Sequence, residues 1–167
     1  LDAGLKTVPA DWPDTGAIDL SVHDLPHASS KMEGWYVNSH FTTTEGEPYS
    51  MFAAFFRVDV TADGAEARRF SHFLTWALVD AANGRYFPHT LLDPKAPALG
   101  LEELEQGTGP RDARLVRALK EVLARNVVPL PDRMMAAEAA VSLDSLSLDF
   151  GANRFRKLPT GEYALDL

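Results

Sequence analysis

The residues of this chain best suited to chemistry lie in one stretch, residues 70–80, which reads FSHFLTWALVD. In a β-strand alternate side chains point to the same face, so His72, Trp76 and Asp80 would share a face with two leucines. A large aromatic ring, two leucines and two ionisable groups on one face are typical of the wall of a ligand cavity. The pattern also fits an ordinary core strand, in which His72 bonds to the backbone and Asp80 lies in the turn that follows.

Asp80 is the residue that this face offers as a proton donor. A carboxylic acid that an apolar pocket keeps protonated can donate its proton to an alkene. An aromatic face stabilises the resulting carbocation by about 0.5–2 kcal/mol, which is the role expected of Trp76. His72 would be a hydrogen-bond partner in the site, but along an ideal strand it lies roughly 26 Å from Asp80, so the two should not touch. The alternative role for Asp80 is to cap the hairpin turn that contains Asn83 and Gly84.

Three further aromatic residues on expected strands, Trp35, Tyr36 and Phe55, are candidates for substrate contact. Aromatic side chains on strands also build ordinary cores, so core packing is the competing interpretation. Glu33, where the first expected strand begins, is a second acid to consider, although a carboxylate at a strand end is usually solvated. The candidate site therefore has Asp80 as its catalytic residue, and its substrate-binding residues are Trp76, His72, Trp35, Phe55 and Tyr36.

Nothing in the sequence indicates a metal or cofactor site. The absence of cysteine excludes thiolate nucleophiles, disulfides and zinc–thiolate sites. The five histidines show no metal-ligand spacing, because the closest pair, His23 and His27, lies in a loop that a proline interrupts. The sequence also has no Gly-rich phosphate loop and no Gly-x-Ser-x-Gly nucleophile turn. The residues therefore indicate neither a metal site nor a phosphate-binding loop.

The composition is that of one globular domain. The 167 residues are 46% hydrophobic and 24% charged, which is enough to bury a core. A net charge of −8 argues against a nucleic-acid partner, which needs a basic surface, and against electrostatic attachment to anionic lipid. No apolar run approaches the ~20 residues of a membrane span. We expect a cytoplasmic protein, and a chain that starts at Leu1 leaves a removed signal peptide open.

The order of patterns predicts an antiparallel, all-β meander or lipocalin-like barrel. Residues 1–30 are rich in Pro, Asp, Ser and His and form an extended lead-in to a β domain over residues 31–167. A helical insertion spans about 98–125, with a weak part at 98–106 and a firm amphipathic part at 111–125. Turn signals separate seven expected strands, at 34–42, 49–60, 70–80, 85–90, about 141–148, 155–158 and 163–167.

The last expected strand, 163–167, has no partner after it, and proteins usually avoid or cover an unpaired sheet edge. Seven strands are also one short of the roughly eight that close a small ligand-holding barrel. We therefore expect a second domain or a second chain to complete the sheet.

Several short motifs occur in order along the chain. They are Glu33-Gly34-Trp35-Tyr36-Val37-Asn38, Tyr49 with Phe55-Phe56-Arg57, Phe70-Ser71-His72-Phe73 with Asp80, Gly84-Arg85-Tyr86-Phe87, Val128-Pro129-Leu130-Pro131-Asp132-Arg133, and Leu148-Asp149-Phe150-Gly151-Ala152-Asn153 before a Gly-Glu-Tyr strand. Over roughly residues 20–167 these motifs resemble the amino-terminal half of the lipocalin-like carotenoid 1,2-hydratase family, also called AttH-like.

The resemblance implies two consecutive lipocalin-like β domains, of which this chain would be the first. It also implies activity on long apolar polyenes without a metal or cofactor: hydration of terminal isoprenoid double bonds, cyclisation of terpenoid chains, or intramolecular cycloaddition of polyketide polyenes. The family has no compact catalytic signature, so it assigns no role to any residue here.

The leading hypothesis is a cofactor-independent cyclase or hydratase, of the isomerase or lyase class, that acts on an isoprenoid or related polyene by acid initiation in an apolar cavity. One alternative is a pericyclase, whose cavity folds a polyketide polyene and needs no acid. The other is a carrier that binds a lipid or pigment without chemistry. Turnover that survives Asp80→Asn would favour the pericyclase, and a bound ligand recovered unchanged would favour the carrier.

Overall fold

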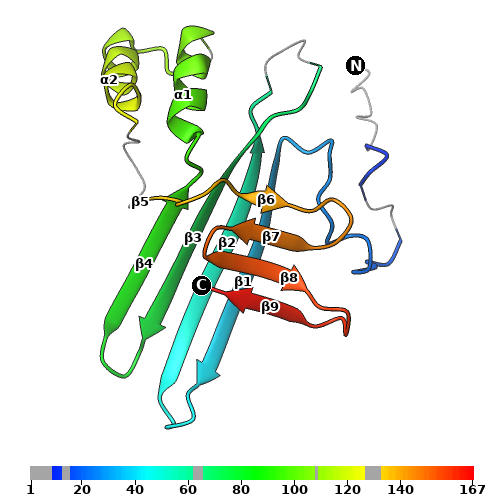
Figure 1. Ribbon diagram of the computed structural model, residues 1–167. Coiled ribbons are helices and arrows are strands. Elements are labelled where there is room, and N and C mark those ends of the chain that lie inside the picture. The colour runs from blue at the N-terminus through cyan, green and yellow to red at the C-terminus, as the bar shows by residue number, and fades with distance from the viewer. Residues whose placement is uncertain (1–8, 13–15, 62–65, 108, 127–132) are drawn as a thin grey trace, which may run out of the picture.

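The computed structural model describes residues 9–12, 16–61, 66–107, 109–126 and 133–167, and these form two β-sheets and two helices (Figure 1). The elements follow in the order β1 (Met32–Thr42), β2 (Pro48–Asp59), β3 (Phe70–Asp80), β4 (Arg85–Leu92), α1 (Ala96–Glu105), α2 (Ala113–Leu123), β5 (Arg133–Met134), β6 (Ala140–Val141), β7 (Ser147–Phe150), β8 (Asn153–Lys157) and β9 (Tyr163–Asp166).

The long sheet has the order β1-β2-β3-β4-β5, and its first four strands form the antiparallel meander that the sequence predicts. Only β5 runs parallel to its neighbour, β4. The short sheet is a second antiparallel meander, β6-β7-β8-β9. It crosses in front of the long sheet in Figure 1.

The prediction of a mostly β, largely antiparallel protein is confirmed, but the described strands do not close into a barrel. Closure would require hydrogen bonds between the edges of one continuous sheet. Here α1 and α2 interrupt the chain after β4, and the strands that follow pair mainly with one another. The result is two layers that pack face to face.

The core lies between the two sheets. Phe55 of β2 and Leu74 of β3 are fully buried, and they pack against Leu148, Phe150 and neighbouring apolar side chains of the short sheet. Each such side chain contributes about 1.5–3 kcal/mol by leaving water. The face of β3 that carries His72, Leu74 and Trp76 is therefore the inner face of the long sheet, and its central part is packed core.

The short sheet covers only part of this inner face. One rung beyond Trp76, Met51, Leu78 and Phe87 pair in register across β2, β3 and β4. All three are partly exposed and lie outside the packed core cluster. In Figure 1 the β1–β2 and β3–β4 hairpins extend past the short sheet. We call this rung the open inner face.

The two helices stand at the opposite end of the long sheet from these hairpins (Figure 1). They confirm the predicted helical insertion. Asp112 caps α2 by accepting a hydrogen bond from the Arg114 N–H at 2.8 Å, and Leu123 at the other end of α2 is buried. None of the helices in the described residues is long and apolar enough to cross a membrane. The Pro-rich part of the motif at 128–133 lies outside the described residues, apart from Arg133.

Candidate functional site

A row of charged and polar side chains crosses the inner face of the long sheet, one rung beyond the core. Strand register places Glu33 of β1 opposite Arg57 of β2, and Arg57 opposite His72 of β3. The Asp93 N–H donates to the His72 carbonyl at 2.9 Å, so Asp93 continues the row just after β4. We call these four residues the charged row. Arg57, His72 and Asp93 are 3%, 6% and 0% exposed, so the row needs internal partners.

The first two members pair with each other and with the lead-in segment. Arg57 Nη2 donates to Glu33 Oε2 at 2.5 Å, and His27 Nδ1 lies 2.8 Å from Glu33 Oε1. The Arg57 guanidinium also lies over the Phe70 ring, 4.4 Å from its centroid. A buried charge persists only with such partners, and these contacts fix Glu33 and Arg57 as a structural pair.

The last two members form a histidine–carboxylate pair. His72 Nδ1 lies 3.2 Å from Asp93 Oδ2, and the Lys95 N–H donates to Asp93 Oδ1 at 3.2 Å. Burial alone would raise the pKa of Asp93. The hydrogen bond from His72, the Lys95 N–H and the charge of the Lys95 side chain outweigh it and hold that pKa below its usual value. Asp93 is therefore an anion at neutral pH.

An anionic Asp93 determines how His72 can act. When Nδ1–H donates to the carboxylate, Nε2 carries the lone pair, and the imidazole is poised to accept a proton there. The ring is held in place by an edge-on contact with Phe150, with ring centroids 5.4 Å apart. A base oriented by a buried carboxylate is the arrangement that general-base sites use.

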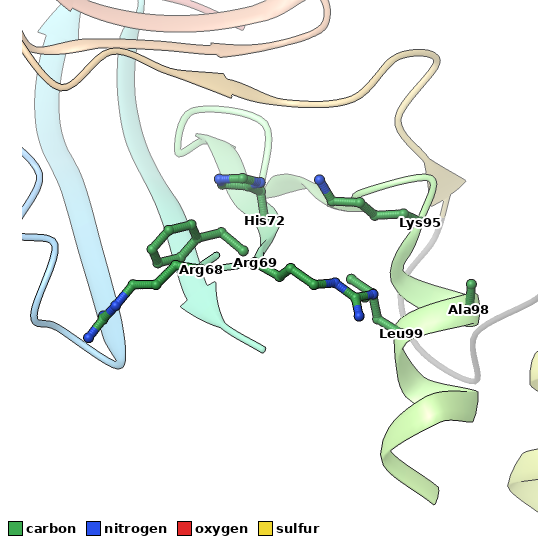
Figure 2. A pocket seen from close by; sticks show the side chains of 7 residues that line it. Arg68, Arg69, His72, Lys95, Ala98 and Leu99 are labelled. Atoms are coloured by element: carbon green, nitrogen blue, oxygen red, sulfur yellow. The ribbon is translucent and has the colours of Figure 1, made fainter. Parts of the chain in front are cut away.

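His72 opens onto a pocket of about 400 Å³ between the start of β3 and the start of α1. Figure 2 shows Lys95 extending toward His72, while Arg69 lies beside Leu99. Arg68 extends away from these side chains in Figure 2 and pairs with Asp59 at 3.1 Å. The described lining contains no carboxylate, but its other cations pair with carboxylates beside it: Arg69 with Glu102 at 2.8 Å, and Lys95 with Asp93 at 3.6 Å and with Glu138 at 3.5 Å. The positive charge of the pocket is therefore partly neutralised.

Asp80, the expected proton donor, lies at the far end of β3 and is 3% exposed. Its Oδ1 accepts the Asn83 N–H at 3.1 Å and the Asn83 Nδ2 at 3.0 Å, and its Oδ2 accepts the same amide at 2.9 Å. These contacts are those of a hairpin-turn cap, which the sequence offered as the alternative to a catalytic role for Asp80. His72 lies near the other end of the strand, so the structure does not bring the two together, as expected.

The aromatic candidates separate into three groups. Trp35 and Phe55 face each other in register at the core, and Phe55 is fully buried against Phe150. Trp76 lies between the core and the open inner face, and its ring contacts that of His89 in a tilted arrangement with centroids 4.4 Å apart. Its buried Nε1 has no hydrogen-bond partner in the described chain. Tyr36 points to the opposite face of the sheet and is 73% exposed, so it does not join the others.

The sequence reasoning missed Arg57, Asp93 and Lys95 as site residues. A usable signal exists for Asp93: once Asp80 pairs with Arg85 across the hairpin turn, counting back along both strands places Asp93 opposite His72. The position of Lys95 depends on the turn into α1, which no strand period predicts. Within the described ranges no three His, Asp or Glu side chains converge as a metal ion would require.

No protein-family model, curated protein or solved structure matches this chain.

Proposed function

We propose that the protein is a cofactor-independent hydratase or cyclase that transfers protons through His72. Its substrate would be a largely apolar, unsaturated molecule, such as an isoprenoid or polyene, that carries a conjugated carbonyl or carboxylate. The observation that carries the proposal is the contact between His72 Nδ1 and the fully buried carboxylate of Asp93. His72 lines a pocket that is also lined by Lys95.

The proposed reaction is a conjugate addition. His72 Nε2 takes the proton from a water molecule or from a hydroxyl of the substrate, and the oxygen forms a C–O bond at the β-carbon. The π electrons of the double bond move toward the carbonyl, and the negative charge on its oxygen is stabilised by Lys95 and Arg69. His72 then returns its proton to the α-carbon, so atoms and charge balance without a cofactor.

This proposal keeps the substrate class expected from the sequence and changes the proton-transfer group. An ionised Asp93 cannot protonate an isolated alkene. In the proposed reaction Lys95 and Arg69, each of which also pairs with a carboxylate, stabilise developing negative charge rather than a carbocation. General acid–base catalysis by a positioned imidazole contributes typically about 10²–10⁴-fold to a rate.

The test is proton exchange at the α-carbon. The protein is incubated in D₂O with a panel of polyenes that end in a conjugated ketone or carboxylate, and deuterium uptake is followed by mass spectrometry. We expect uptake with the wild type, a loss of about 10²-fold or more in His72→Gln, and unchanged uptake in Asp80→Asn. Equal uptake in wild type and His72→Gln would refute the proposal.

A second candidate is the acid-initiated polyene cyclase or hydratase expected from the sequence, with substrate on the open inner face. The observation that favours it is the partly exposed rung of Met51, Leu78 and Phe87 beside Trp76, because aromatic and apolar side chains suit a polyene. Activity lost in Asp80→Asn but kept in His72→Gln would select this candidate. Activity kept in both variants would select a pericyclase, and a polyene bound but never converted would select a carrier.

A further inference from the structure

The outer face of the long sheet, which is the side turned away from the short sheet, has an unusual composition. Strand register aligns four rungs of four outward side chains across β1, β2, β3 and β4. We call this set the outer grid, and it consists of the alternate residues within 34–40, 50–56, 73–79 and 86–92. None of them is Asp, Glu, Lys or Arg, although these types make up 24% of the chain. A sheet face that meets only water normally carries polar and charged side chains.

Several large apolar side chains of the outer grid are exposed. Tyr36 and Tyr86 are 73% and 63% exposed, and Phe52 and Val79 are 40% and 37% exposed. On the first rung Phe56 and Phe73 stack across the strands, with ring centroids 4.3 Å apart. Single exposed apolar side chains are ordinary, but a contiguous patch that spans four strands is typical of a surface that binds another protein.

Polar members of the outer grid bond to one another. His40 Nδ1 lies 2.7 Å from Ser50 Oγ, and the hydroxyl oxygens of Thr75 and Thr90 lie 3.4 Å apart. Both contacts run between neighbouring strands within the face. Burial of a polar group is costly when the group loses its hydrogen bonds to water without replacement. These groups already have partners, so a second protein can cover the face at low cost.

The size of the outer grid suits a protein–protein interface. Four strands and four rungs cover roughly 19 Å by 27 Å, or about 500 Å² in plan, from the ordinary spacings of a β-sheet. The accessible surface is larger, because the side chains stand out from that plane. Stable complexes bury about 800 Å² on each partner, so the outer grid supplies most of what one such interface needs.

We propose that the outer grid is the interface between two copies of this chain, packed sheet on sheet across a two-fold axis. Each copy carries a charge of −8, so two copies repel each other, and they approach most easily where neither presents a charge. A strongly basic partner would instead be recognised by carboxylates, which this face lacks.

The pattern of side-chain sizes also fits a two-fold interface. Phe52 pairs in register with Ala77 and is followed on the same face by Ala54. A large side chain beside two small ones is a self-complementary pattern, because the Phe52 ring of each copy can lie over the alanines of the other. The pocket at His72 shares no residue with the outer grid, so the dimer leaves that pocket free and does not depend on the reaction proposed there.

The test is the molar mass of the full chain in solution, measured by light scattering and by analytical ultracentrifugation over a series of concentrations. We expect a concentration-dependent dimer of twice 18.3 kDa. We also expect association to stay constant or to tighten from about 0.05 M to about 0.5 M NaCl, because salt screens the repulsion between the acidic copies. A monomer at every concentration, or a dimer that salt dissociates, would overturn the proposal.

Variants then locate the interface. Phe52→Lys and Tyr86→Lys each place a charge in the outer grid, and each should raise the Kd of the dimer by about 100-fold or more. Leu143→Lys is the matched control, because Leu143 is 61% exposed and lies outside the four strands of the grid. It should leave the Kd unchanged.

Circular dichroism checks that each variant is folded. Should Phe52→Lys unfold, Tyr86→Lys decides the question, since a side chain that is mostly exposed tolerates the change. A dimer that persists unchanged in Tyr86→Lys would show that the copies meet through another surface, which would overturn the proposal.

Discussion

At the scale of single residues, Asp93 has the clearest consequence for stability. Its pKa in the folded protein lies below the ordinary value of 3.8, so its carboxylate stabilises the fold above that pH. The stabilisation is lost as pH falls through the lower, folded-state pKa. We expect Asp93→Asn to be about 1–3 kcal/mol less stable than wild type at pH 7, because His72 loses a charged acceptor. Between pH 5 and pH 2 the variant should lose less further stability than wild type.

Urea unfolding at a series of pH values measures both effects. Asp149→Asn is the matched control, since Asp149 pairs with Arg154 on the surface and surface pairs contribute only about 0–1 kcal/mol. Parallel pH profiles for wild type and Asp93→Asn would contradict the assigned role of Asp93.

Asp80 makes a second prediction at this scale. Because its carboxylate and Asn83 bond to each other, removing either partner removes the same interaction. We expect Asp80→Ala and Asn83→Ala each to lower the free energy of unfolding by about 1–2 kcal/mol. The double variant should cost about 1 kcal/mol less than the sum of the two single variants. Thermal or urea unfolding of the four proteins measures this coupling, and strict additivity would refute the turn-cap role.

Strand alternation alone was enough to place several residues on the correct face. Because side chains alternate along a strand, His72, Leu74 and Trp76 are predicted to share one face of β3. That face is the one that meets the short sheet. It could not show that Asp93 and Arg57 lie beside His72, because those contacts depend on the register between strands. It also could not place Lys95 or the lead-in segment, since turns and loops carry no period.

At the scale of elements, the strand pairing and the turn of the β3–β4 hairpin give a specific prediction. Asp80 pairs with Arg85, so residues 81–84 form the turn, and Gly84 has a positive φ of 62°. A side chain at that φ strains the backbone. We expect Gly84→Ala to destabilise the protein by about 1 kcal/mol. Gly16→Ala is the control, because an added Cβ there meets no atom within 4 Å and should change stability little. Equal effects of the two substitutions in thermal unfolding would contradict the prediction.

The predicted boundaries were accurate where an element is long and strongly patterned. Residues 70–80 were expected as a strand and form β3, and the two parts of the expected helical insertion became α1 and α2. The two-residue strands β5 and β6 were not predicted separately, because two residues carry no measurable period. Their existence depends on which strand lies beside them, which is a tertiary property.

At the scale of the whole molecule, the described strands form the expected antiparallel meander but do not close into a barrel. Counting strands does not determine which edges meet, and here the strands after β5 cross over the long sheet as a separate layer. That arrangement divides the inner face into a covered part and the open inner face. The charged row lies at one end of the covered part, and Asp80 lies beyond the open rung at the other.

This division predicts that two matched substitutions lower the free energy of unfolding by different amounts. Phe150 is 1% exposed in the short sheet, and Phe150→Ala should cost about 3–5 kcal/mol because it opens a cavity in the core. Phe87 on the open inner face is only partly buried and contacts Arg85 through its ring face, so Phe87→Ala should cost about 1–2 kcal/mol. Urea unfolding of both variants measures the difference. Should Phe87→Ala prove as costly as Phe150→Ala, the open inner face must be covered in solution. It would then be unavailable to a polyene, and the pocket at His72 would be the better place to look for substrate.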